Sequence, residues 1–144
     1  MPRMAEVVLY PSQYADVESI VKAIDGRGWK YCIIKHDKDK REDGTLKDAH
    51  YHCYVHFGGA NWQFKNIANA FNVGENYVNK IKGTWSDVEA YAVHRNAQDK
   101  YQYPLEEVTA NYDFAVAIEK REQFRENTAR KHEIRDNIVS GNWH

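Results

Sequence analysis

Hydrophobic and polar residues alternate most regularly in the segment AHYHCYVHF, residues 49–57. Successive side chains of a β-strand point to opposite faces, so this alternation predicts a strand with one buried face. The apolar set is expected in the core: Ala49, Tyr51, Cys53, Val55 and Phe57. The other set is too polar for a core and presents imidazoles on the opposite face: His50, His52, Tyr54 and His56.

Segments rich in β-branched and aromatic residues predict three further strands, at residues 6–11, 29–36 and 77–81. Helices are predicted at about residues 14–24, 61–71, 84–95 and 113–139. Their expected N-caps are Ser12 or Asp16, Asn61 and Thr84.

The order of these elements is β-α-β-β-α-β-α followed by a C-terminal helix. The loop between the second and third strands is too short to hold a crossover helix, so the sheet should be largely antiparallel. We therefore predict an α+β fold of ferredoxin-like or RRM-like type, with helices packed on one face. Such a sheet leaves its other face open for a ligand.

Composition places the chain among ordinary globular proteins, with 144 residues, 42% hydrophobic and 28% charged. The longest apolar runs span only a few residues, which predicts no transmembrane helix, no secretory signal and no membrane partner. Cys32 and Cys53 are expected to be free and reduced, which fits a cytoplasmic protein. The net charge of −1 argues against coating of nucleic acid by bulk electrostatics but leaves a local site open.

Two histidines on one strand face can bind one cation. His50 and His52 are about 6.6–6.8 Å apart along the strand, and their rings can both reach an ion at about 2.0–2.1 Å. His36 and Asp39, at the end of the preceding strand, add an imidazole and a carboxylate. This mixed donor set suits Mn²⁺ or Mg²⁺ better than a structural zinc ion.

The position of His36 raises a difficulty. Strict alternation places His36 on the face of Cys32 and Ile34, which are expected in the core. A twist or bulge at the strand end is therefore expected to bring His36 to the histidine face. Cys53 has the wrong parity to join the histidines.

Tyr91 is a candidate nucleophile. It lies late in the predicted helix at 84–95, and His94 and Arg95 are expected on its helical face. A phenol with a pKa near 10 needs a base, a metal or a positive field before it attacks. Tyr101 and Tyr103 precede Pro104 in a loop, where their side chains are expected to be poorly fixed.

Four sequence blocks together resemble the HUH endonucleases: VLYP at 8–11, HDKD at 36–39, HYH at 50–52 and YAVH at 91–94. The match is closest to plasmid rolling-circle replication initiators, includes KYQY at 100–103, and covers roughly residues 5–105. The resemblance implies that His50 and His52, with His36 and Asp39, bind a divalent cation. It also implies that Tyr91 attacks DNA, leaving a 5′-phosphotyrosine and a free 3′-OH. Viral relatives usually carry lysine where this chain has His94, which favours the plasmid or phage branch.

The resemblance also implies partners and a domain organisation. Single-stranded or extruded origin DNA is the expected substrate, with the host replication machinery acting afterwards. Residues 1–110 are expected to form the endonuclease domain. Residues 111–144 are expected to pack on it or to lead into a C-terminal region that allows oligomerisation. The expected DNA contacts are Lys38, Lys40, Arg41, Lys80, His94, Arg95 and Lys100, with Trp62 or Tyr77 stacking on bases.

Three alternatives remain open. A mobilisation relaxase or a single-tyrosine transposase would use the same chemistry. A non-catalytic nucleic-acid-binding module would place aromatic residues, not histidines, on the open face of its central strand. An unrelated enzyme with a His-x-His pair would need the many strands of a cupin, or the two His-x-Thr/Ser motifs of a phosphoesterase, which this sequence lacks.

Overall fold

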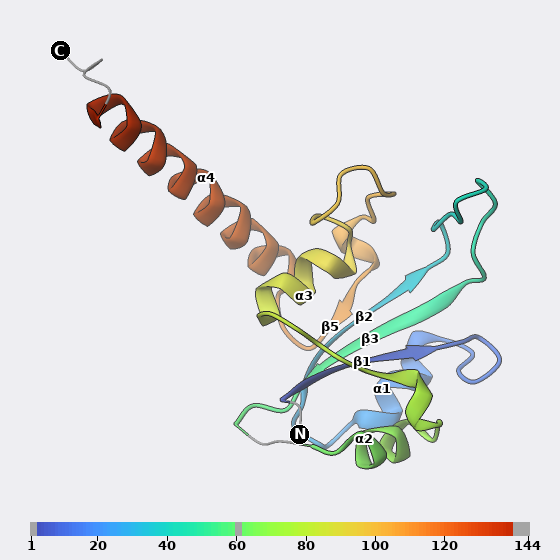
Figure 1. Cartoon of the computed structure of the whole chain (residues 1–144). Helices are drawn as coiled ribbons and strands as arrows, with labels where there is room; N and C mark the ends of the chain where they lie inside the picture. The colour runs from blue at the N-terminus through green and yellow to red at the C-terminus, as the bar shows by residue number, and fades with distance from the viewer. Residues whose placement is uncertain (1–2, 60–61, 140–144) are drawn as a thin grey trace.

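A single antiparallel sheet organises the computed structural model, which describes residues 3–59 and 62–139, with side chains as far as residue 128. Within this part of the chain the sheet has five strands in the order β4-β1-β3-β2-β5, and all neighbours are antiparallel (Figure 1). The strands are β1 (Met4–Leu9), β2 (Lys30–His36), β3 (His50–His56), β4 (Val78–Lys80) and β5 (Thr109–Ala110). The predicted α+β, ferredoxin-like class is confirmed. The two-residue strand β5 was not predicted, since its sequence is too short to show a pattern.

The described part of the chain also contains four helices and two short 3-10 turns, of which all but the last helix lie between strands. They are α1 (Val17–Ile24), α2 (Phe64–Phe71), η1 (Glu75–Tyr77), α3 (Trp85–Ala92), η2 (Leu105–Glu107) and α4 (Phe114–Val139). Capping boxes confirm Asp16 and Thr84 as N-caps, because each side chain accepts a hydrogen bond from the backbone three residues on. The expected cap Asn61 lies outside the described residues, and α2 begins after Gln63.

One face of the sheet carries the larger core. α1 and α2 pack there, and Ile20, Ile67 and Phe71 meet the apolar side chains of β1 and β3. The apolar face predicted for β3 is confirmed, since Cys53 and Val55 are fully buried in this core. Figure 1 shows α1 and α2 together on this side of the sheet.

The opposite face is not wholly open. α3 and the first turns of α4 cover part of it, and Val88 and Ile118 pack against Cys32, Ile34 and the buried Tyr54. Helices therefore cover both faces, whereas the sequence predicted them on one. Figure 1 shows α4 beginning beside α3 and then running away from the sheet. Among the described helices, none is both long and apolar enough to cross a membrane.

The strand register corrects the expectation of a twist or bulge at His36. β2 and β3 pair without interruption, with Cys32 opposite Tyr54, Ile34 opposite His52 and His36 opposite His50. Directly opposed residues share a face, so all three β2 residues lie on the histidine face. The burial of Cys32 and Ile34 and the strict alternation are both confirmed, and no bulge is needed because the sheet buries apolar residues on both faces. Cys32 and Cys53 are accordingly free cysteines in separate cores.

Candidate active site

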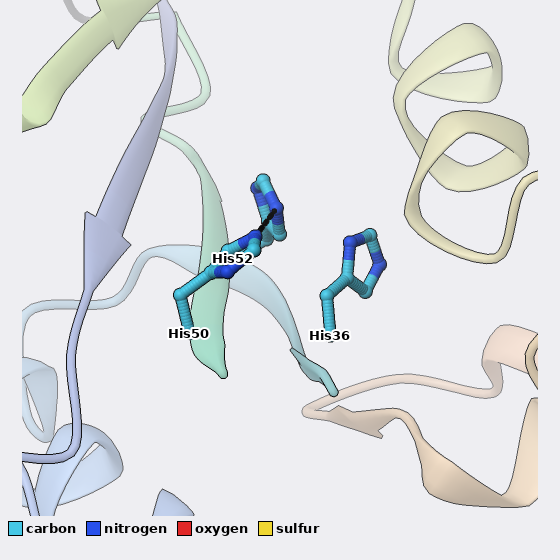
Figure 2. Close-up of side chains that lie close together, drawn as sticks. All are labelled: His36, His50 and His52. Carbon is cyan, nitrogen blue, oxygen red and sulfur yellow. Dashed lines mark hydrogen bonds between the residues drawn. The ribbon is translucent and has the colours of Figure 1, made fainter. Parts of the chain in front are cut away.

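Three imidazoles converge where β2 ends and β3 begins. His36 stands on β2, and His50 and His52 stand on the adjacent β3 (Figure 2). The ring of His36 lies 4.3 Å from that of His52 and 5.9 Å from that of His50, centroid to centroid. One ring nitrogen from each lies within 4.8 Å of the others, so the group could hold a metal ion.

Hydrogen bonds orient the rings of His50 and His52. The Nδ1 atom of His50 is 2.7 Å from the carbonyl oxygen of Asp48, and Nδ1 of His52 is 3.2 Å from Oε2 of Glu6. Because each Nδ1 faces an acceptor, it carries the ring's proton, and Nε2 is left with a lone pair. Glu6 comes from β1 and is itself held by Asn79 of β4. Such carboxylate–histidine pairs fix the ring orientation of metal ligands in many proteins.

The two Nε2 atoms face each other at a separation of 3.0 Å. Figure 2 marks this contact, and a metal cation between the two rings would accept both Nε2 lone pairs. Two ligand atoms that bind an ion at about 2.1 Å with a right angle between them lie about 3.0 Å apart. The pair of His50 and His52 therefore has the spacing of adjacent ligands in an octahedral site.

His36 is buried and presents one nitrogen to Asp39. Its Nε2 is 2.7 Å from the carbonyl oxygen of Ala92, and its Nδ1 is 3.2 Å from Oδ2 of Asp39. Burial, followed by the positive charge of a protonated His52, lowers the pKa of His36 to about 4. A neutral His36 donates from Nε2 to Ala92, so its Nδ1 lone pair faces a carboxylate oxygen. These two acceptors fit a cation between them.

Tyr103 holds Asp39 in place. Its hydroxyl donates to Oδ1 of Asp39 at 2.7 Å and accepts from the backbone N–H of Lys38 at 3.0 Å. Its ring stacks on His36 with centroids 4.4 Å apart. Burial alone would raise the pKa of Asp39, but the Tyr103 hydrogen bond and the neighbouring imidazoles hold that pKa below its usual value. The expectation that Tyr103 is poorly fixed is wrong, because it is fully buried.

Tyr91 lies on α3 beside this cluster and is 42% exposed. It lines a pocket of about 570 Å³ together with Glu6, Tyr54 and Lys80. Burial, and then the negative charges of Glu6 and Asp39, raise the pKa of Tyr91. The hydroxyl is thus reachable from solvent but is not ionised at neutral pH.

The helix carrying Tyr91 ends sooner than the sequence predicted. α3 ends at Ala92. The backbone N–H of Arg95 then donates to the carbonyl oxygen of Ala90, and the N–H of His94 donates to the carbonyl oxygen of Tyr91. This pattern is a Schellman cap, in which His94 takes the left-handed conformation usually given to glycine, with φ of 63°. His94 and Arg95 therefore do not continue Tyr91's helical face, and that prediction is wrong.

His94 joins the other side of the cluster. Its Nδ1 is 2.8 Å from the carbonyl oxygen of Tyr101 and 4.0 Å from Oδ1 of Asp39. His36, Asp39 and His94 form a second group that could hold a metal ion. A buried residue with a left-handed backbone is costly and is typical of functional sites. Arg95 instead binds the carbonyls of Val93 and Tyr103, which fixes the 101–103 loop.

The other expected DNA contacts fall in different places. A second pocket of about 570 Å³ is lined by four of them, Lys38, Lys40, Arg41 and Lys100. Asp39 and His94 line the same pocket. Trp62 packs against Trp29 and Phe57 in the core under α1 and α2, away from the histidine face, so it cannot stack on DNA there. Tyr77 contacts Tyr10, whose ring lies 6.1 Å from that of His50.

Sequence reasoning gave no supporting role to three residues that contact this site: Glu6, Tyr103 and the buried Tyr54. Glu6 could have been noticed as a carboxylate inside the apolar strand β1. Alternation did place Tyr54 on the histidine face, but its burial, and the bond of Tyr103 to Asp39, depend on contacts between distant segments.

Comparison with known proteins decides the family. The family model described as "Plasmid replication protein, origin binding domain" matches residues 6–117. The chain belongs to this family. A curated relative, the "Replication protein" of Onion yellows phytoplasma (strain OY-M), is 35% identical over 109 residues, covering 68% of this chain and 29% of the relative. This origin-binding domain thus spans less than a third of that relative's length.

Membership implies that this origin-binding domain contacts DNA at a replication origin. The plasmid replication family expected from the sequence blocks is therefore confirmed. The histidine cluster, Tyr91 and both pockets fall within the matched residues, apart from two arginines of α4.

Proposed function

We propose that this origin-binding domain is a metal-dependent endonuclease of the HUH type. It nicks one strand of origin DNA through Tyr91, giving a 5′-phosphotyrosine and a free 3′-OH that host polymerase extends in rolling-circle replication. The observation that carries this proposal is the convergence of the lone pairs of His36, His50 and His52 beside an exposed tyrosine. A purely DNA-binding surface would not need imidazoles held with their lone pairs toward one point.

The donor atoms suit a divalent cation. His50 and His52 would bind it through Nε2 and His36 through Nδ1, whereas Asp39 falls in the other possible group, with His36 and His94, and its Oδ2 lies 3.2 Å from Nδ1 of His36. Three imidazoles, a carboxylate beside one of them and the right-angle spacing of His50 and His52 favour an octahedral ion such as Mn²⁺ or Mg²⁺ over a thiolate-bound zinc. When bound, the ion supplies Lewis-acid stabilisation of negative charge on the scissile phosphate.

Tyr91 performs the bond exchange. Its phenolic oxygen forms a bond to phosphorus as the bond to the 3′ oxygen breaks, and the phenol's proton ends on the departing 3′-OH. One phosphodiester replaces another, so the step is nearly neutral in energy and can be reversed to rejoin strands. Because the pKa of Tyr91 is raised, proton removal must accompany attack.

The other tyrosines near the cluster are less suited to attack. Tyr103 is fully buried and its hydroxyl is bonded to Asp39, so a phosphate cannot reach it without disrupting the site. Tyr101 is 46% exposed but lies in the loop between α3 and η2. A helix holds a nucleophile in line with phosphorus better than such a loop, and about 1 Å of misplacement can cost on the order of 10²-fold in rate.

The test uses a labelled library of single-stranded oligonucleotides with randomised sequence, incubated with the domain and Mn²⁺. A covalent protein–DNA band should persist on a denaturing gel, disappear with EDTA, and be absent for Tyr91→Phe. Sequencing of the attached strands would give the preferred nick site. Binding without any covalent band would favour a non-catalytic origin-binding module. An equal band from Tyr91→Phe would overturn the assignment of the nucleophile.

A further inference from the structure

α4 brings two arginines to the pocket that Tyr91 lines. Arg121 and Arg125 are four residues apart, so they project from the same face of the helix. Lys80, at the end of β4, and Lys82, just after it, line the same pocket. The wall beside Tyr91 thus carries four cationic side chains from two segments that are distant in sequence.

The acidic groups of this pocket are already engaged inside the protein. Glu6 accepts hydrogen bonds from His52 and Asn79. Asp87 caps α3 and lies 3.2 Å from the guanidinium of Arg121. By contrast, the side chains of Lys80, Lys82 and Arg125 are exposed to solvent. The pocket therefore offers positive charge to a ligand.

Tyr54 also lines this pocket and is 2% exposed. Burial, followed by the negative charge of the neighbouring Glu6 carboxylate, raises the pKa of Tyr54, so its hydroxyl stays neutral. Tyr54 lies on β3 two residues from His52, so the pocket adjoins the histidine cluster.

We propose that this pocket is a subsite for the sugar-phosphate backbone of single-stranded DNA, with Arg121 and Arg125 contacting phosphates next to the one that Tyr91 attacks. This inference rests on the proposed function. Successive arginines on this face are about 6 Å apart along the helix axis, a separation similar to that of consecutive phosphates in an extended strand. α4 then belongs to the DNA site.

Fluorescence anisotropy can test the subsite without any cleavage. Binding of labelled oligothymidylate is measured over a salt series in EDTA, in the Tyr91→Phe background. Loss of two phosphate contacts in Arg121→Gln/Arg125→Gln should reduce the slope of log affinity against log salt by about 1.4 and weaken binding on the order of tenfold. Lys120→Gln, a charge change on α4 outside the pocket, should leave both quantities unchanged.

Arg121 also bonds to Ser86 and Asp87, so its loss could disturb the packing of α4 on α3. Arg125→Gln alone avoids this problem and should reduce the slope by about 0.7. If Arg125→Gln binds like Lys120→Gln, the subsite proposal is wrong, whatever the outcome of the covalent assay. If Arg125→Gln weakens binding but wild type forms no covalent adduct, the subsite stands and the nicking proposal fails.

Discussion

The Nε2 atoms of His50 and His52 lie 3.0 Å apart, and the Nδ1 atom of each ring faces an oxygen acceptor. The protons are thereby held on the outer nitrogens, and the inner lone pairs point at each other. Two residues of one strand thereby present two nitrogen atoms that could hold a metal ion with no large movement.

The first prediction follows from that pair. His52→Ala should lower Mn²⁺ affinity by more than the roughly 10–100-fold that loss of an outer hydrogen-bond partner costs. Isothermal titration calorimetry on folded protein measures this directly. His56→Ala is the matched control. His56 lies on the same strand, but it packs against Trp85 and does not belong to the cluster of His36, His50 and His52. Equal affinities for the two variants would exclude His52 as a ligand.

Glu6 should act on metal binding without touching the ion. Its carboxylate accepts from Nδ1 of His52, so Glu6→Gln removes the charge that fixes this tautomer. We expect a fall of about 10–100-fold in Mn²⁺ affinity with the fold preserved by circular dichroism. Asn79→Ala, which removes Glu6's other partner, should have a smaller effect. Unchanged affinity in Glu6→Gln would show that His52 is oriented by the strand alone.

Tyr103 should affect metal binding at the site but should not take part in the bond exchange itself. Tyr103→Phe keeps the stacked ring but removes the hydrogen bond to Asp39, so higher Mn²⁺ concentrations should be needed for adduct formation. The adduct itself should still form. Tyr101→Phe provides the comparison, because its hydroxyl makes no such bond to Asp39, and its Mn²⁺ requirement should match that of wild type. Complete loss of the adduct in Tyr103→Phe at saturating Mn²⁺ would contradict this role.

The metal-free domain should lose stability on mild acidification. Burial lowers the pKa of His36 from its ordinary value of 6.5 to about 4. Between these two pH values His36 binds a proton in the unfolded chain but not in the folded domain. The free energy of unfolding that His36 contributes is therefore fully present above pH 6.5 and falls as the pH drops toward 4. From about pH 7 to about pH 5 the free energy of unfolding should drop by about 2 kcal/mol on this account. Urea unfolding in EDTA should show this drop in wild type and not in His36→Asn. If the free energy of unfolding changed with pH in the same way in both proteins, the role given to His36 would be disproved.

The sequence predicted the strands well where one face is strongly apolar. β3 is the clearest case, because its alternation identified both the core residues and the histidine face. The same reasoning correctly placed Cys32 and Ile34 in a core and on the face of His36. It wrongly added a bulge, since alternation does not reveal that a second core covers the histidine face. That second core exists because α3 and α4 pack there, a tertiary contact that no local pattern encodes.

The end of α3 shows another limit of local patterns. Helix ends are usually identified from a glycine at the left-handed position, and here His94 takes that conformation. Hydrogen bonds from Arg95 and Gln102 and the burial of His94 hold the turn. The sequence therefore predicted a longer helix, and the approach of His94 to Asp39 could be found only from the structure.

The central claim is that Tyr91 forms the bond to DNA. Trypsin separates the candidates, because Tyr91 falls in the peptide 83–95, whereas Tyr101 and Tyr103 fall together in the peptide 101–120. The covalent complex formed with Mn²⁺ is digested with nuclease and trypsin and mapped by mass spectrometry. The account predicts a nucleotide on Tyr91 in the peptide 83–95, and no adduct in Tyr91→Phe. A nucleotide on the peptide 101–120 would contradict it.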